Sequence, residues 1–219
     1  MKVISMVAGI VILSGISTYC LAGDGIFFIG TDVGRANYHI NSADDTPLNV
    51  FGNRLNKGEV GGALRFGYRW HGIVDYGLET GYVDLGQVSA TYYPPYANKY
   101  QADLKERGWM LGGNLRYNIS GNWYGLVHGG WFRAQVNNRG TEDLSPHCSP
   151  GVVCPLYGGS MQYKSFQSGN GEYVGVGGGF NFSSNFSLGL AYDYYHSNRL
   201  SNGTAINAGL YSLSAEYRF

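Results

Sequence analysis

The strongest constraint on the fold is a set of short segments in which apolar and polar side chains alternate. One of them, LYSLSAEYRF at residues 210–219, places Tyr211, Leu213, Tyr217 and Phe219 on one side and serines, a glutamate and an arginine on the other. Strict period-two alternation predicts a β-strand with one apolar face and one polar face. Such a strand needs other apolar material to cover its apolar face.

Seven further segments show the same alternation, and in each the side opposite the apolar residues carries glycine, amide or charged side chains. They are residues 27–34, 60–70, 77–82, 109–117, 122–134, 174–182 and 188–194. In residues 122–134 both sides carry aromatic rings, and we assign Trp123, Val127 and Trp131 to the apolar face because His128 lies on the other. No window has the sustained apolar spacing of an amphipathic helix that could cover these strands.

Eight strands with an uncovered apolar face predict an all-β protein, an eight-stranded antiparallel transmembrane β-barrel. Lipid covers the outer face of such a barrel, and ring closure satisfies the backbone hydrogen bonds. In a soluble β-sandwich the apolar faces would instead meet in a core, and the faces seen here are too aromatic to leave in water.

The connections between the segments alternate between short and long. HGIV, NISGN and SSN are short, whereas about 86–106 and about 136–171 are among the long ones. This alternation is typical of outer-membrane barrels, which have short periplasmic turns and long extracellular loops.

The N-terminus has the layout of a secretory signal peptide, with Lys2, an apolar run and small residues before a polar break. We therefore expect a signal peptide at 1–22 and a barrel domain at 23–219. A lipid-modified Cys20 is the alternative, which the bulky Tyr19 before it disfavours.

The remaining cysteines and the charge balance exclude several classes of function. Cys148 and Cys154 predict a disulfide within a loop, and only His147 lies beside them, so we expect no metal site. Lys plus Arg and Asp plus Glu number 15 each, which disfavours nucleic acid as a partner. The glycine-rich GVGGGF precedes no helix and is no phosphate loop, so no cofactor is expected.

In order and spacing, several runs resemble the transmembrane domain of the OmpA family: GTDVGRANYHI, GLETGYVDLG, GGNLRYNI, GGWFRA and the ending LYSLSAEYRF. The resemblance implies a barrel in the Gram-negative outer membrane. It also implies that the alternate residues Tyr211, Leu213, Tyr217 and Phe219 form a signal for the barrel-assembly machinery.

The chain departs from that family in two respects. Longer members carry a peptidoglycan-binding domain, and none is expected here because nothing follows Phe219. Members also place an ion-pair gate inside the barrel; Glu79 resembles its acidic member, but the positions of its partners read Asn114, Asn181 and Gly189. We therefore do not expect that gate to be intact.

Charged residues on the inward side predict an interior network. An eight-stranded barrel is just wide enough for its own side chains to fill it, and unpaired buried charge is very unfavourable, so these groups should pair with one another. Such packing favours a structural interior, and a narrow, low-conductance channel is the alternative. The predicted members are Asp32, Arg65, Arg69, Asp75, Glu79, Arg116, Asp193, Glu216 and Arg218.

His196 and Ser197 raise the possibility of catalysis, because DYYHSNRLSNG resembles a stretch of the lipid A deacylase family. Adjacent residues of a regular strand point to opposite faces, which disfavours a nucleophile and base pair unless a bulge intervenes. A lipid A-modifying enzyme is therefore the alternative to a non-enzymatic protein.

The prediction is an outer-membrane barrel with a role in envelope integrity and in adhesion-type surface interaction. Loops on a rigid scaffold carry such functions, and the second loop offers Tyr92, Tyr93, Tyr96 and Tyr100 for contact. The expected partners are outer-membrane lipids, lipopolysaccharide, the barrel-assembly machinery and a host or surface ligand.

Overall fold

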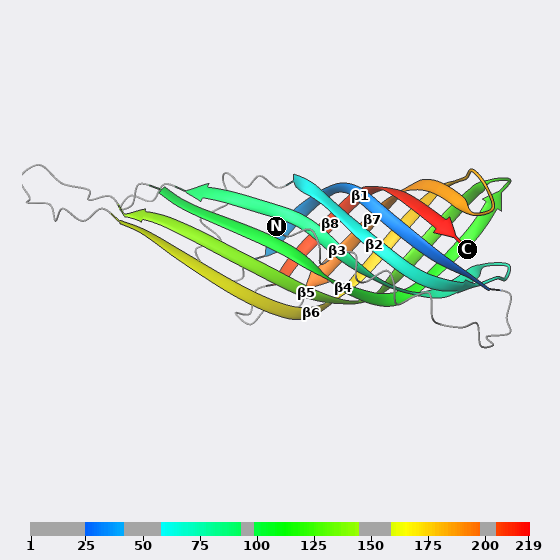
Figure 1. Ribbon diagram of the computed structural model, residues 1–219, viewed down its shortest axis with the longest axis horizontal. Coiled ribbons are helices and arrows are strands. Elements are labelled where there is room, and N and C mark those ends of the chain that lie inside the picture. The colour runs from blue at the N-terminus through cyan, green and yellow to red at the C-terminus, as the bar shows by residue number, and fades with distance from the viewer. Residues whose placement is uncertain (1–24, 42–57, 93–98, 145–158, 198–204) are drawn as a thin grey trace, which may run out of the picture.

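Eight antiparallel strands close into a barrel in the computed structural model, which describes residues 25–41, 58–92, 99–144, 159–197 and 205–219. Each strand pairs with the next along the chain, and β1 pairs with β8 to complete the ring (Figure 1). The predicted all-β, eight-stranded antiparallel barrel is confirmed. The strands are β1 (Gly25–Asn41), β2 (Gly58–Trp70), β3 (Asp75–Tyr92), β4 (Lys99–Ser120), β5 (Trp123–Leu144), β6 (Gly159–Asn181), β7 (Phe186–Ser197) and β8 (Ala205–Arg218).

The two ends of the barrel differ in their connections. Short turns at 71–74, 121–122 and 182–185 join β2 to β3, β4 to β5 and β6 to β7, and we name this the turn end. Gly121 has a φ of +56° in the second of these turns, a conformation that glycine adopts without a steric penalty. The opposite end, where the other connections lie, is the loop end.

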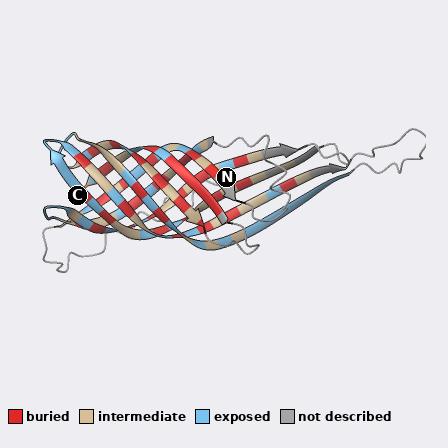
Figure 2. Ribbon diagram, turned by 180° about the vertical axis from the view of Figure 1, so that it is seen from behind, coloured by how far each residue is buried: buried red, intermediate tan, exposed pale blue. Residues whose placement is uncertain are grey.

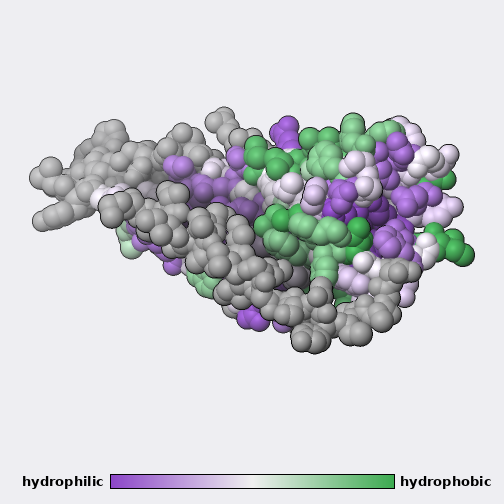
Figure 3. Space-filling model, turned by 45° about the vertical axis from the view of Figure 1, so that its right-hand side comes forward, coloured by the Kyte–Doolittle hydropathy of each residue, from purple (hydrophilic) through white to green (hydrophobic). Residues whose placement is uncertain are grey.

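The barrel body has an apolar outer surface and a largely polar interior. On β7, Leu190 is 70% exposed whereas Asp193 is fully buried, and β5 likewise exposes Trp123 and Trp131 and buries His128. The strands therefore show an alternation of buried and exposed residues (Figure 2). Apolar residues gather over the barrel body in the space-filling view (Figure 3). The predicted orientation of these faces is confirmed.

Toward the loop end the outer face becomes polar and the inner face becomes apolar. On β5, Trp131 is the last large apolar residue on the outer face, and Arg133 follows it there. The interior side changes from the polar His128 to Phe132 and Val136, which are both buried. Apolar residues therefore face lipid in one half of the barrel and face each other in the other half.

Four strands continue well beyond the rest of the barrel at the loop end. β4, β5 and β6 have 22, 22 and 23 residues, whereas β7 has 12, and with the end of β3 they form a projecting sheet (Figure 1). We name this sheet the extension. The segments predicted as loops at about 86–106 and 136–171 are largely strand, which corrects the predicted boundaries. Their alternation is present, but the outer residues are polar, so the pattern of outward apolar residues does not extend into these segments.

A β-bulge in β3 marks the start of the extension. Between Asp84 and Gln87, β3 has two residues opposite the single Glu106 of β4. One of them, Gly86, has a φ of +79°, and a Cβ there would lie 2.7 Å from the carbonyl oxygen of Val60. This position therefore requires glycine.

The bulge also changes which residues of β3 face the interior. Val88 is buried and Gln87 is exposed after the bulge, whereas regular alternation would have turned Val88 outward. The hydroxyl of Tyr38 donates a hydrogen bond to the carbonyl of Leu85 within the bulge, at 3.1 Å. The irregularity thus preserves an apolar interior in the extension.

We expect Gly86→Ala to lower the free energy of unfolding by about 1–3 kcal/mol, because alanine is strained at positive φ and meets Val60. Urea unfolding in phospholipid vesicles, followed by tryptophan fluorescence, measures this change. Gly30→Ala is the control, since the nearest atom to its Cβ would be 3.8 Å away. Equal losses in the two variants would contradict a special role for the bulge.

Candidate functional site: a barrel closed in three layers

A layer of arginines surrounds one carboxylate near the turn end. Arg69 donates to both oxygens of Glu216 at 3.1 Å, and Arg116 Nη1 donates to Oε1 of the same carboxylate at 2.6 Å. Arg218 lies 3.9 Å from Glu216 and donates to the side-chain oxygen of Asn181 at 3.1 Å. Glu216 therefore holds three guanidinium groups, and we name this the arginine layer.

Aromatic rings and amides complete the arginine layer. The guanidinium of Arg69 lies 4.2 Å from the ring centre of Phe28, and that of Arg116 lies 3.6 Å from the ring centre of Tyr124. Arg69 Nε also donates to the side-chain oxygen of Asn114 at 2.7 Å. Cation–π contacts and amide acceptors thus compensate arginines that have only one carboxylate between them.

A second layer, which we name the acidic layer, lies in the middle of the barrel. Arg65 contacts Asp32 at 2.5 Å and Asp193 at 3.0 Å. His128 lies between two carboxylates, with Nε2 2.7 Å from Asp193 and Nδ1 3.1 Å from Glu79. All five side chains are almost completely buried, so the three carboxylates depend on these two partners.

The surroundings of His128 favour the protonated imidazolium, because both ring nitrogens face carboxylates and a neutral ring can donate from only one of them. The hydroxyl of Tyr173 donates a further hydrogen bond to Glu79 at 2.8 Å. Gly175 makes room for this arrangement, since a Cβ there would collide with His128 and Asp193. Sequence reasoning placed His128 inward but did not identify it or Tyr173 as partners of Glu79.

The two layers carry opposite excess charge. The arginine layer has three arginines and one carboxylate, and the acidic layer has three carboxylates, one arginine and His128. Together they contain four arginines and four carboxylates, with His128 as a fifth cation when it is an imidazolium. The excess positive charge of one layer thus largely offsets the excess negative charge of the other.

The loop-end side of the interior is an apolar plug. The rings of Phe132 and Tyr195 pack edge to face with centres 5.2 Å apart, and Tyr195 stacks on Tyr173 at 6.1 Å. Sequence reasoning missed this plug, although alternate residues such as Ala134 and Val136 indicate it. Its members are Ala36, Tyr38, Ala63, Val83, Leu85, Val88, Leu104, Met110, Phe132, Ala134, Val136, Tyr173, Tyr195, Ile206, Ala208 and Leu210.

Glu106 lies among the residues of the plug and is 1% exposed. The Ser197 hydroxyl lies near this carboxylate but donates to the carbonyl of Ile206. Within the described part of the chain, neither carboxylate oxygen therefore has a hydrogen-bond partner. The boundary prediction placed Glu106 at the end of a loop, so sequence reasoning could not assign it to the interior. It is the one large departure from charge compensation among the buried carboxylates described above.

Asp75 is the predicted network member that lies elsewhere. The structure brings the other eight predicted residues together in the two layers, whereas Asp75 lies at the β2–β3 turn. It contacts His71 Nδ1 at 3.2 Å and accepts a hydrogen bond from the backbone of Gly72 at 3.3 Å. The side chain of the first residue of a strand can form hydrogen bonds with the preceding turn instead of pointing into the barrel interior.

His196 and Ser197 lie on opposite faces of β7, which is regular at this point. His196 Nδ1 contacts the side-chain oxygen of Asn207, and the Ser197 hydroxyl donates to the carbonyl of Ile206 at 3.0 Å. The two side chains do not form a nucleophile and base pair in this arrangement.

Several predictions lie outside the described residues. These are the signal peptide at 1–22, the cysteines Cys148 and Cys154, and Tyr93 and Tyr96. Tyr92 and Tyr100 pair with each other across β3 and β4 instead of lying in a loop. The described residues contain no group of His, Cys, Asp or Glu that could hold a metal ion. They also contain no helix of the length and hydropathy needed to cross a membrane.

A sequence model described as the outer membrane protein beta-barrel domain matches residues 8–219. The chain belongs to this family. Membership places the barrel in the Gram-negative outer membrane. In such barrels the short turns are periplasmic and the loop end is extracellular, so the extension projects outward from the cell.

Several solved structures of outer-membrane proteins are similar to this chain. OprG from Pseudomonas aeruginosa has a TM-score of 0.50 at 10% identity, covering 90% of this chain and 96% of that chain. Ail from Yersinia pestis, solved with the heparin analogue sucrose octasulfate, has a TM-score of 0.46 at 16% identity and coverages of 90% and 99%. Neisserial surface protein A has a TM-score of 0.45 at 14% identity and coverages of 88% and 97%. No curated protein sequence matches the chain.

The C-terminal residues of this outer-membrane barrel lie on its lipid-facing surface. Tyr211, Leu213, Tyr217 and Phe219 are all exposed there, as their alternation requires. The backbone N–H of Phe219 donates to the carbonyl of Phe27 at 3.0 Å, which fixes the last residue against β1.

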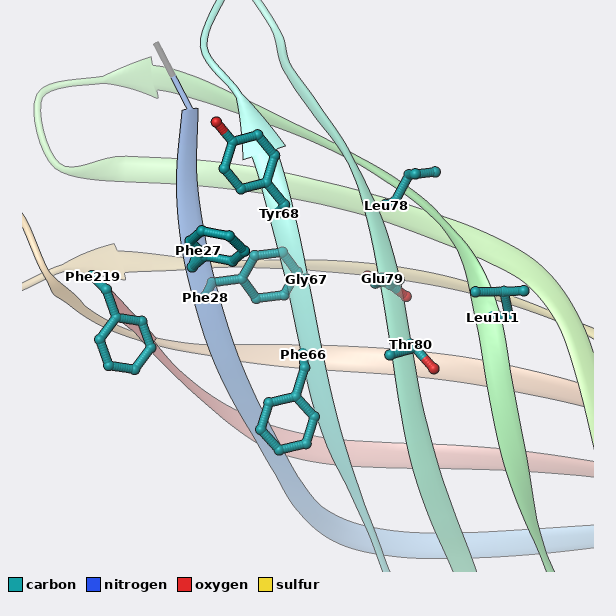
Figure 4. Close-up of a pocket in the computed structure, with 10 residues that line it drawn as sticks. All are labelled: Phe27, Phe28, Phe66, Gly67, Tyr68, Leu78, Glu79, Thr80, Leu111 and Phe219. Atoms are coloured by element: carbon teal, nitrogen blue, oxygen red, sulfur yellow. The ribbon is translucent and has the colours of Figure 1, made fainter. Parts of the chain in front are cut away.

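An apolar hollow lies beside this terminus on the outer surface of β1 to β4 (Figure 4). Phe27, Phe66, Leu78, Leu111 and Phe219 border it on the outside. Lipid tails can fill an apolar hollow in this position, so the surface needs no protein partner to cover it.

Proposed function

We propose that the protein is a closed, non-catalytic anchor of the outer membrane that contributes to envelope integrity and presents its extension for adhesion-type contacts. The proposal includes that the chain is an OmpA-type transmembrane domain and that it is exported with a signal peptide that is then cleaved. The observation that carries the proposal is the combination of a filled interior with a sheet that projects beyond the membrane.

The filled interior argues against conduction. An ion entering from the periplasmic side meets three guanidinium groups at Glu216 and then the buried contacts of Arg65 and His128. Beyond these lies a mostly apolar plug, in which an ion would lose most of its hydration and meet Glu106 as the one buried carboxylate described there. A narrow channel would require both layers and the plug to rearrange.

The extension has features of a contact surface. Residues 159–170 of β6 pair with β5 on one side, and none of the described strands pairs with them on the other, because β7 pairs only from Gly171 onward. Met161 and Phe166 are 63% and 61% exposed on this edge strand. An unpaired edge with exposed apolar side chains is a template for adding an extended polypeptide from another protein.

Trimming the extension tests the adhesive role. Asn138 pairs with Ser165, so a two-residue Asn-Gly hairpin can replace residues 138–165 and leave the barrel body intact. Cells that display the full barrel should bind to host-cell or matrix surfaces, and cells that display the trimmed barrel at equal abundance should not. Equal binding by both would reject the extension as the contact surface.

Two further measurements test the closed and non-catalytic character. Purified barrel in planar bilayers should give no stable conductance steps. Lipid A mass spectra should be identical from cells with the protein, cells without it and cells with His196→Ala. A new lipid A species that disappears in His196→Ala would overturn the proposal in favour of an enzyme.

A further inference from the structure

The outer boundary of the hydrocarbon region can be located on β4 and β5 from their exposed side chains. Leu111 and Trp109 are 58% and 55% exposed on the outer face of β4, and the next outward residue is Arg107. On β5, Trp131 is followed on the same face by Arg133, which pairs directly with Trp109. Tryptophan is enriched where hydrocarbon meets headgroups, so both arginines lie at headgroup level.

Beyond this boundary, cations gather on the outer face of β4, β5 and β6, which we name the outward basic face. Outward positions of these three strands supply it, and the strand registers place one or two of the cations on each of four neighbouring rows. Its members are Lys105, Arg107, Arg133, Arg139 and Lys164.

Among the side chains that the structure describes, three carboxylates share this face, and two of them are already engaged. Asp84 contacts Lys105 at 2.7 Å, and Asp103 accepts a hydrogen bond from the hydroxyl of Ser89 at 2.7 Å. The third, Glu172, pairs across from Trp131 on the lipid side of the rows of cations. Five cations therefore face three carboxylates.

Four of the five cations make no ion pair with any residue of the described chain: Arg107, Arg133, Arg139 and Lys164. Arg107 Nε is in addition buried without a hydrogen-bond partner among these residues. A buried donor of this kind is unfavourable unless a ligand or water accepts from it.

Farther from the membrane, Arg139 lies directly opposite Lys164 in the register of β5 and β6. Like charges in directly opposed positions destabilise a sheet, and the two residues border a polar hollow with Gln101, Asp103, Thr141 and Gln162. Asp103 lies opposite Arg139 on β4, but it forms no ion pair with Arg139 and accepts its hydrogen bond from Ser89 instead. An anion in this hollow would remove the repulsion. The surface thus presents one anion site at headgroup level and a second one beyond it.

We propose that the outward basic face binds lipopolysaccharide of the same membrane. Arg107 and Arg133 contact a phosphate of the lipid A headgroup, and Arg139 and Lys164 contact acidic groups of the core sugars. Lipopolysaccharide has acyl chains that would lie on the membrane side of Trp109 and anionic groups that would extend toward the loop end. One such lipid therefore matches both sites at once. This inference requires the barrel to be in the outer membrane and does not depend on the adhesive role.

Binding of labelled rough lipopolysaccharide to the folded barrel in detergent, followed by fluorescence anisotropy, tests the proposal. The double variants R107Q/R133Q and R139Q/K164Q should each bind about tenfold or more weakly, as expected for lost hydrogen bonds between charged groups. The affinity should fall with rising salt. R35Q is the matched control, since Arg35 is an exposed, outward arginine on β1, and it should bind as the unaltered protein does.

Dephosphorylated lipopolysaccharide distinguishes the headgroup from other anions. It should bind as weakly to the unaltered barrel as intact lipopolysaccharide binds to R107Q/R133Q, and millimolar inorganic phosphate should not displace the lipid. Unchanged binding in both double variants would overturn the proposal. Equal binding of a soluble sulfated polysaccharide, lost in the same variants while lipopolysaccharide binding persists, would reassign the face to soluble polyanions and also overturn it.

Discussion

Arg65→Met is expected to lower the free energy of unfolding by about 3–5 kcal/mol, the range for removing one member of a buried ion pair. Arg65 is the only arginine that contacts Asp32 and Asp193 among the described residues, and both carboxylates are almost fully buried. Without it, His128 alone faces the negative charges of the acidic layer. Methionine has a similar volume, so the loss is one of charge and hydrogen bonding more than of packing.

Urea unfolding of the folded barrel in phospholipid vesicles gives the measurement. The double variant Arg65→Met with Asp193→Asn should recover part of the loss, because it removes one uncompensated carboxylate. Arg139→Met on the exposed outer face is the control and should change stability by less than about 1 kcal/mol. A loss for Arg65→Met no larger than that of the control would show that the acidic layer is hydrated and not a closed network.

The barrel was predictable from sequence because lipid imposes a simple rule on each strand. In the half that crosses the membrane, outward residues such as Leu78 and Leu190 must be apolar, and inward residues such as Glu79 and Asp193 must not face lipid. Alternation of period two therefore identifies the strands and their faces together. Even the aromatic-rich β5 could be oriented, because His128 belongs inside.

The extension was not predictable by the same rule, because water replaces lipid around it. Outward residues become polar, as Arg133 is, and inward residues become apolar, as Phe132 is, while the alternation continues. A strand in this region has the pattern of a strand in a soluble protein, so the absence of outward apolar residues predicts a loop where the structure has a strand. The position on a strand where outward residues change from apolar to polar, and inward residues from polar to apolar, is itself a sequence signal for the membrane boundary.

The inward charges were predictable as a set, but their pairing was not. Alternation gives the face of each residue and not its height in the barrel, which the register of neighbouring strands determines. Glu79 and His128 meet across β3 and β5, two strands apart, and Asp75 belongs to a turn although its parity on β3 is inward. Tyr173 could be identified as a partner only when the position of β6 was known.

Glu216→Gln and Glu106→Gln are expected to change stability in opposite directions, although both replace a buried glutamate by its neutral isostere. Glu216 contacts Arg69, Arg116 and Arg218, and its loss leaves three guanidinium groups close together with no anion between them. We expect a loss of about 3–5 kcal/mol, as for other broken buried ion pairs. Glu106 has no such partner in the described chain and lies in the apolar plug, so a neutral side chain there should leave stability equal or higher.

Unfolding of the two variants under the same conditions at pH 7 separates charge compensation from simple filling of space. Asp75→Asn is the matched control at the turn end, where the carboxylate serves an exposed His71 and should contribute no more than about 1 kcal/mol. If Glu216→Gln is as stable as Asp75→Asn, water must solvate the arginine layer from the periplasmic side. If Glu106→Gln is destabilised as strongly as Glu216→Gln, Glu106 must have a partner that holds its charge inside the plug, and the loop-end half of the barrel is then a polar closure and not an apolar one.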